Sequence, residues 1–235
     1  MSKHIITLPC RLLQGLIVVT NDDGDWIVDT GSPVSIGDIA TTRFGHVNVP
    51  LNSDAFGLTC DELRSLFKAP VAGLIGMDVL NRYGLFDPEN GQAVLSDVPL
   101  RQMDDLKDWH EIPLTFRYHM GMMDVSVDGV QTQAIFDTGA NLSYWQRGFR
   151  PDWPQGGSYD DFHPSLGEFT TDTAVAPVRV TGTPDWAGPL RVGHLPGLIG
   201  AVVDQLGGGL IGLDLLRGGP LMIAYPQNKI FVRRL

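Results

Sequence analysis

The sequence is short of cysteine, of basic residues and of long apolar runs. Its two cysteines, Cys10 and Cys60, lack the spacing of metal ligands, which favours buried thiols over a zinc site. No apolar run approaches the roughly 18 residues of a membrane-spanning helix, and the apolar stretch at the start is too short for a secretory signal peptide. The 17 basic residues face 27 acidic ones, and a net charge of −10 argues against a nucleic-acid surface. We therefore expect a cytoplasmic protein that binds neither membranes nor nucleic acid.

Signals for a bound metal or cofactor are also missing. The six histidines show no ligand spacing. The run Gly207-Gly208-Gly209 is not followed by the Lys-Ser/Thr of a phosphate loop. We expect no metal and no cofactor.

One pattern occurs twice, in which an apolar strand ends in Asp-Thr-Gly. The first copy is Trp26-Ile27-Val28-Asp29-Thr30-Gly31-Ser32, and the second, 108 positions later, is Ala134-Ile135-Phe136-Asp137-Thr138-Gly139-Ala140. A repeat of about a hundred residues indicates a tandem duplication into two domains rather than a solenoid. We place these domains at residues 1–103 and 104–235, joined by a polar linker at 99–108.

Both copies are rich in strand signals. In each, an Asp-Gly turn lies between two β-rich runs, residues 16–20 and 26–28 in the first copy and 123–127 and 133–136 in the second. Residues 44–49 read as another strand. Thr59 is a helix cap for residues 61–67, and further short helices are expected near Asp78 and Asp214. The predicted fold class is all-β with few short helices.

The second copy contains an insertion. Asp29 and Gly76 are 47 positions apart, whereas Asp137 and Gly212 are 75 apart. Residues 146–161 are rich in Pro, Gly and Asp and are expected to form a loop. Residues 162–170 and 173–180 follow as two strand segments about a glycine-containing bend. They form a candidate flap that offers Phe162, Gly167, Glu168 and Phe169.

The doubled pattern resembles the signature of the aspartic peptidases, which include the pepsins and the retroviral proteases. The signature is complete twice: Ile27-Val28-Asp29-Thr30-Gly31-Ser32 with Leu74-Ile75-Gly76, and Ile135-Phe136-Asp137-Thr138-Gly139-Ala140 with Leu210-Ile211-Gly212. The resemblance implies a small single-chain bilobal form. Its two homologous closed-barrel-like lobes would be related by pseudo-two-fold symmetry, as in the acid protease fold.

The resemblance also implies a function, that of a monomeric aspartic endopeptidase, a hydrolase of peptide bonds. Two carboxylates about 3 Å apart share one proton, because like charges at that distance cannot both ionise comfortably. Asp29 and Asp137 are the candidate catalytic residues, and they would activate a water to attack an extended peptide or protein substrate. The resemblance further implies apolar residues on both sides of the cleaved bond.

The neighbours of the two aspartates have expected supporting roles. Gly31 and Gly139 let backbone N–H groups approach the carboxylates, and the resemblance implies that Thr30 and Thr138 bond across to the opposite lobe. The Ser32 hydroxyl is expected to donate to Asp29, whereas Ala140 offers no such donor to Asp137. A working pH displaced toward neutrality follows from that difference.

Two alternatives from other classes remain open. The first is a catalytically silent peptide-binding module with the same fold. The second is a scaffold or dimerisation domain in which the aspartate pair only fixes the association of the lobes. A ligand that raises the melting temperature favours the first over the second.

Overall fold

The computed structural model describes residues 5–55, 57–181 and 187–233, and it is mostly β. The prediction of a mainly β protein with few short helices is confirmed. The first half of the chain contains β1 (Ile5–Leu13), β2 (Leu16–Asn21), β3 (Gly24–Val28), β4 (Ile36–Gly37), β5 (Thr41–Phe44), β6 (Val47–Pro50), β7 (Asp54–Ala55), β8 (Leu58–Thr59), α1 (Cys60–Phe67), β9 (Val71–Ile75), α2 (Met77–Leu80), β10 (Tyr83–Asp87), β11 (Gln92–Ser96) and the 3₁₀ turn η1 (Arg101–Asp104). The second half contains β12 (Trp109–Arg117), β13 (Met120–Val127), β14 (Val130–Phe136), β15 (Ser143–Trp145), β16 (Gln155–His163), β17 (Gly167–Val180), β18 (Ala187–Gly193), α3 (Gly197–Leu206), β19 (Gly209–Ile211), η2 (Leu213–Leu216), β20 (Leu221–Ala224), η3 (Tyr225–Gln227) and β21 (Lys229–Arg233).

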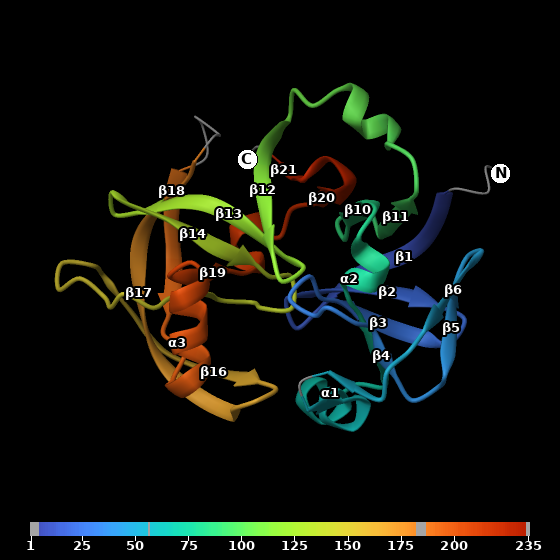
Figure 1. The fold of residues 1–235 in the computed structure, drawn as a ribbon, viewed down its shortest axis with the longest axis horizontal. Helices are drawn as coiled ribbons and strands as arrows, with labels where there is room; N and C mark the ends of the chain where they lie inside the picture. Colours follow the sequence, from blue (N-terminus) through green and yellow to red (C-terminus); the bar gives the residue numbers. More distant parts are fainter. Residues whose placement is uncertain (1–4, 56, 182–186, 234–235) are drawn as a thin grey trace.

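Figure 1 shows β2 to β6 and α1 on one side of the molecule and β13 to β19 with α3 on the other. A run of antiparallel pairings joins the two sides in the order β1, β11, β10, β20, β21, β12. Its central pairing, β10 with β20, connects the two halves through backbone hydrogen bonds. Most of the described strands thus form one large connected sheet with no clear barrel, and β5–β6 and β7–β8 form two separate two-stranded sheets.

Each half delivers its Asp-Thr-Gly turn from the second strand of a hairpin. β3 pairs antiparallel with β2, and β14 pairs in the same way with β13. The other edge of β3 pairs in parallel with β9, as that of β14 does with β19. Residues 26–28 and 134–136 are at most 4% exposed, so the apolar runs seen in the sequence are core strands.

Helix α1 begins where its sequence signals place it. Thr59 accepts a hydrogen bond from the Glu62 backbone N–H, and the Glu62 carboxylate accepts one from the Thr59 backbone N–H, which completes a capping box. Leu63 and Phe67 bury the inner face of the helix. Within the described residues, no helix is long and apolar enough to cross a bilayer.

The structure differs from the sequence-based expectation in three places. Residues 44–49 are not one strand: β5 ends at residue 44, residues 45–46 form the turn, where Gly45 has φ +58°, and β6 begins at residue 47. Residues 155–161 are not loop, because they pair with β17 as part of β16. The bend of that hairpin falls at 164–166, and β17 continues unbroken through 180. In each case backbone pairing with a neighbouring strand prevails over local composition.

We predict that Thr59→Ala destabilises the protein by about 1 kcal/mol, because it removes one of the two bonds of the capping box. Urea unfolding measures the loss. Thr59→Ser keeps the hydroxyl and should stay close to wild type, and equal stability of all three proteins would show that the cap contributes nothing.

Candidate functional site

Asp29 and Asp137 occupy matching positions at the ends of buried strands. Asp29 follows β3 directly, and its backbone N–H donates to the carbonyl of Ile75 at 3.0 Å. Asp137 follows β14, and its N–H donates to Ile211 at 3.0 Å. The apolar-apolar-Gly triplets therefore hold the backbone of each aspartate from the neighbouring parallel strand.

The two carboxylates face each other across the junction of the two halves and are hydrogen-bonded to one another. A Cβ atom on Gly31 would lie 2.6 Å from the Asp137 carboxylate, and one on Gly139 would lie 2.5 Å from that of Asp29. Only glycine allows each turn to approach the opposite aspartate this closely. The glycines of the motif are thus required by the contact between the halves.

The threonines of the motif lock the two turns together. The Thr30 hydroxyl donates to the Phe136 carbonyl at 3.0 Å, and the Thr138 hydroxyl donates to the Val28 carbonyl at 2.8 Å. Each hydroxyl also accepts the backbone N–H of the other threonine at 3.0 Å. Both side chains are at most 1% exposed, so these four bonds are made away from water.

Backbone N–H groups donate to one oxygen, Oδ1, of each member of the aspartate pair, meaning Asp29 and Asp137. Gly31 and Ser32 donate to Asp29 at 2.8 and 3.1 Å, and Gly139 donates to Asp137 at 2.8 Å. The Ser32 hydroxyl donates to the Val34 carbonyl instead of to Asp29, so the expected difference from Ala140 does not arise through that hydroxyl.

Burial raises the pKa of both carboxyls, and the charge of Asp137 raises that of Asp29 further. Their mutual hydrogen bond raises the pKa of Asp29 and lowers that of Asp137. Two coupled carboxyls whose pKa values are raised share one proton and titrate as a unit. The pair can therefore donate one hydrogen bond and accept another at the same place.

A serine–aspartate bridge supports each turn from behind. The Ser35 hydroxyl donates to Asp78 at 2.7 Å and accepts the Gly76 N–H at 3.0 Å. In the second half, the Ser143 hydroxyl donates to Asp214 at 2.5 Å and accepts the Gly212 N–H at 3.1 Å. The sequence placed both aspartates in short helices, where α2 and η2 do contain them, but it did not reveal their serine partners. The signal was present, because both serines lie six positions after an Asp of the pair.

The candidate flap is the far end of the β16–β17 hairpin. Phe162 lies opposite Glu168, and Gly167 lies opposite His163. Phe169 lies opposite Asp161 and near the ring of Tyr144, with 6.4 Å between the ring centroids. Asp161 in turn accepts a hydrogen bond from the Tyr144 hydroxyl, and its charge contributes to the raised pKa of Asp137. The hairpin therefore lies within electrostatic reach of the pair, and sequence reasoning missed both Tyr144 and Asp161.

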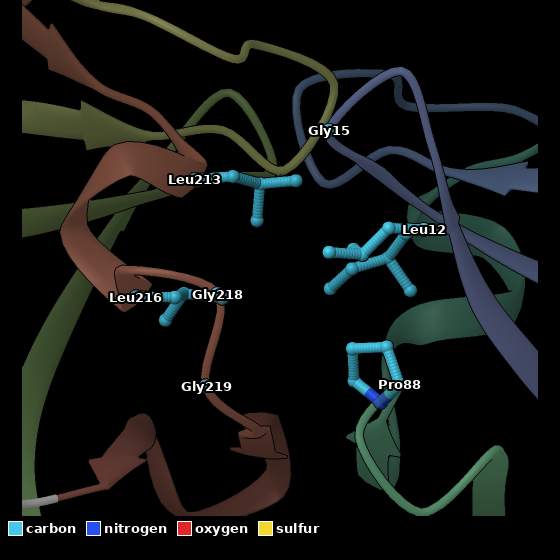
Figure 2. Close-up of a pocket in the computed structure, with 8 residues that line it drawn as sticks. Leu12, Gly15, Pro88, Leu213, Leu216, Gly218 and Gly219 are labelled. Carbon is cyan, nitrogen blue, oxygen red and sulfur yellow. The ribbon is translucent and has the colours of Figure 1, made fainter.

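A small apolar cavity lies elsewhere on the junction of the halves. Leu12 and Pro88 line it from one side, and Leu213 and Leu216 from the other (Figure 2). Its volume of about 30 Å³ corresponds to about one water molecule, which excludes it as a peptide site. The described residues contain no group of three or more side chains suited to hold a metal ion.

Two solved structures of globulins share this fold. The chain matches basic 7S globulin from soybean with a TM-score of 0.53 and 9% identity, covering 98% of this chain and 96% of the other. It matches conglutin gamma, a basic 7S globulin from lupine seeds, with a TM-score of 0.52 and 11% identity, covering 98% and 95%. No family model matches the chain. No curated protein matches it either.

These comparisons correct the prediction of an aspartic peptidase. The two structures described above are globulins, and neither a family model nor a curated protein connects the chain with peptidases. The predictions of an aspartic endopeptidase, and with it of a hydrolase acting on a peptide substrate, are therefore wrong. The physical reason is that the fold itself needs the signature: the threonines make the bonds between the halves, and the glycines allow their close contact.

We predict that Thr138→Val destabilises the protein by about 2–4 kcal/mol, because it leaves a buried N–H and a buried carbonyl without partners. Thr30→Val should cost a similar amount. The double variant should cost less than the sum, since both hydroxyls belong to one network. Urea unfolding of the single and double variants tests this, with exposed Thr41→Val as the control. Strictly additive losses would contradict a shared network.

A second prediction concerns pH. Burial raises the pKa of Asp214 from 3.8 to about 6, so between these values the folded protein binds more protons than the unfolded chain. This contribution makes stability fall as the pH rises from about 4 to about 6. Asp214→Asn removes the titrating group. The free energy of unfolding should then fall less across this pH range, by on the order of 2 kcal/mol. Urea unfolding across this range checks the slopes, and parallel curves for the two proteins would contradict the assignment.

Proposed function

We propose that this chain is a binding module that captures an extended polypeptide segment at the aspartate pair without cleaving it. The observation that carries the proposal is the hydrogen-bonded carboxylate pair at the junction of the two halves. Backbone N–H groups donate to one oxygen of each carboxylate and fix its position. A pair with one proton offers a donor and an acceptor side by side. A peptide group, with its carbonyl and its N–H, is complementary to both.

The cost of the pair argues for such a role over that of a scaffold. Two adjacent carboxyls with raised pKa values destabilise the folded protein at neutral pH. The bonds of Thr30 and Thr138 already hold the halves together without any contribution from the carboxylates. A module that only fixed the association of its halves would gain nothing from retaining the second charge.

The proposal includes a finer account of the fold. We assign two homologous lobes, residues 1–103 and 104–235, related by pseudo-two-fold symmetry. The matched hairpins, parallel pairings and serine–aspartate bridges support this assignment. In the second lobe the pairings run from β13 through β14, β19, β15, β18 and β17 back to β13, which supports a barrel-like lobe. A monomer in the cytoplasm remains our expectation.

The globulin matches bear on this proposal only through the fold. Both matched proteins are described as basic 7S globulins, whereas this chain carries a net charge of −10. Charge steers association and selects partners. We therefore do not transfer a partner from the globulins to this chain.

We predict that a pool of acetylated random octapeptides contains ligands that raise the melting temperature of the protein. A ligand at about a hundred times its Kd adds about 2.7 kcal/mol of stability. Asp29→Asn and Asp137→Asn should each weaken binding by about tenfold or more, because each replaces one carboxyl of the proton-sharing pair, which supplies a donor and an acceptor together, with an amide.

The control is Asp54→Asn, the same substitution at an exposed position in β7. It should bind the pool as the wild type does. A pool that never changes the melting temperature would leave only the scaffold account. The same would follow if Asp29→Asn and Asp137→Asn bound the pool as strongly as the control does.

A further inference from the structure

Asp161 is a carboxylate near the aspartate pair that the proposed function does not use. It lies on β16 of the hairpin and accepts hydrogen bonds from the Tyr144 hydroxyl and from the Phe162 backbone N–H, the latter at 2.8 Å. Burial raises the pKa of Asp161, and both bonds oppose that rise because they favour the ionised form. Its side chain is only partly buried, so a ligand can reach it.

The surroundings of Asp161 are aromatic. Tyr159 and His163 alternate with it on one face of β16, and Phe169 is its direct cross-strand neighbour. The Tyr144 ring packs beside Phe169, so one tyrosine contacts both members of that cross-strand pair. A carboxylate flanked by aromatic faces suits a planar cation, which can pair with the charge and stack on the rings.

The charge of Asp161 is not balanced within the described part of the chain, where no ion pair joins it to lysine or arginine. Arg191 lies 5.2 Å over the Tyr159 ring, but it donates to the Thr173 hydroxyl at 2.8 Å and to the Ser158 carbonyl at 3.1 Å. Burial lowers the pKa of His163, which leaves that ring neutral at neutral pH. With one further charge on the aspartate pair, the site is negative.

We propose that Asp161 selects polypeptide ligands carrying a guanidinium or ammonium group beside the segment that the aspartate pair holds. The ligand class is a peptide with an arginine or lysine side chain, and the inference rests on the proposed function. Tyr144, which donates to Asp161, pairs with Leu210 of β19, and Leu210 pairs with Ile135, two residues before Asp137. One extended ligand can therefore reach both Asp161 and the aspartate pair. The net charge of −10 favours the approach of such a ligand from a distance.

The test uses the same octapeptide pool, captured on the whole immobilised protein at low salt and sequenced by mass spectrometry. Captured peptides should be enriched in arginine and lysine at one position. A matched pair is then synthesised from the best binder, one with arginine at that position and one with glutamine. The wild type should prefer the arginine peptide by about tenfold, since a hydrogen bond to a charged group contributes about 1.5 kcal/mol.

Two asparagine variants separate the local effect from net charge. Asp161→Asn should lose the preference, to below about twofold, yet bind the glutamine peptide as the wild type does. Asp160→Asn makes the same change in net charge at the next residue, which is exposed and lies on the opposite face of the strand. It should keep the preference.

Each other outcome counts against the inference. Octapeptides that bind without enrichment of basic residues would overturn it and leave the proposed function standing. Equal loss of preference in both variants would assign the effect to net charge. Loss of both peptides in Asp161→Asn would assign Asp161 a structural role, and a pool that does not bind at all would overturn the proposed function as well.

Discussion

The structure depends on two partly buried carboxylates held face to face where the halves of the chain meet. Two ionised carboxylates in contact repel each other, so the contact persists only with a shared proton and with hydrogen bonds that fix both turns. Thr30 and Thr138 supply those bonds, and Gly31 and Gly139 leave the space. The conformation of the motif is thus set by an interaction between residues 108 positions apart.

Elements around the aspartate pair and farther from it support this contact. The parallel strands β9 and β19 hold the aspartate backbones, and the serine–aspartate bridges hold the segments that follow each turn. The β10–β20 pairing joins the halves a second time. Two independent connections between the halves leave the turns little freedom to separate, which keeps the pair preorganised for a ligand.

The sequence predicted what repeats and missed what is made by pairing between distant strands. The doubled Asp-Thr-Gly pattern located the aspartate pair, and the helix-capping signal at Thr59 located the start of α1. The turn at Gly45 and the extent of β16 depend on partner strands that local composition does not reveal. The Tyr144–Asp161 hydrogen bond joins residues 17 positions apart on different strands, and no sequence motif predicts it. The functional prediction failed for a different reason, because the signature is also a requirement of the fold.

The central claim is that the aspartate pair binds a peptide and leaves it intact. The most direct test recovers peptides bound to the protein after long incubation at several pH values from acidic to neutral, and determines their masses. Our account predicts unchanged masses across the range. Fragments that accumulate with the wild type, and not with Asp29→Asn or Asp137→Asn, would contradict it and show that the pair cleaves what it binds.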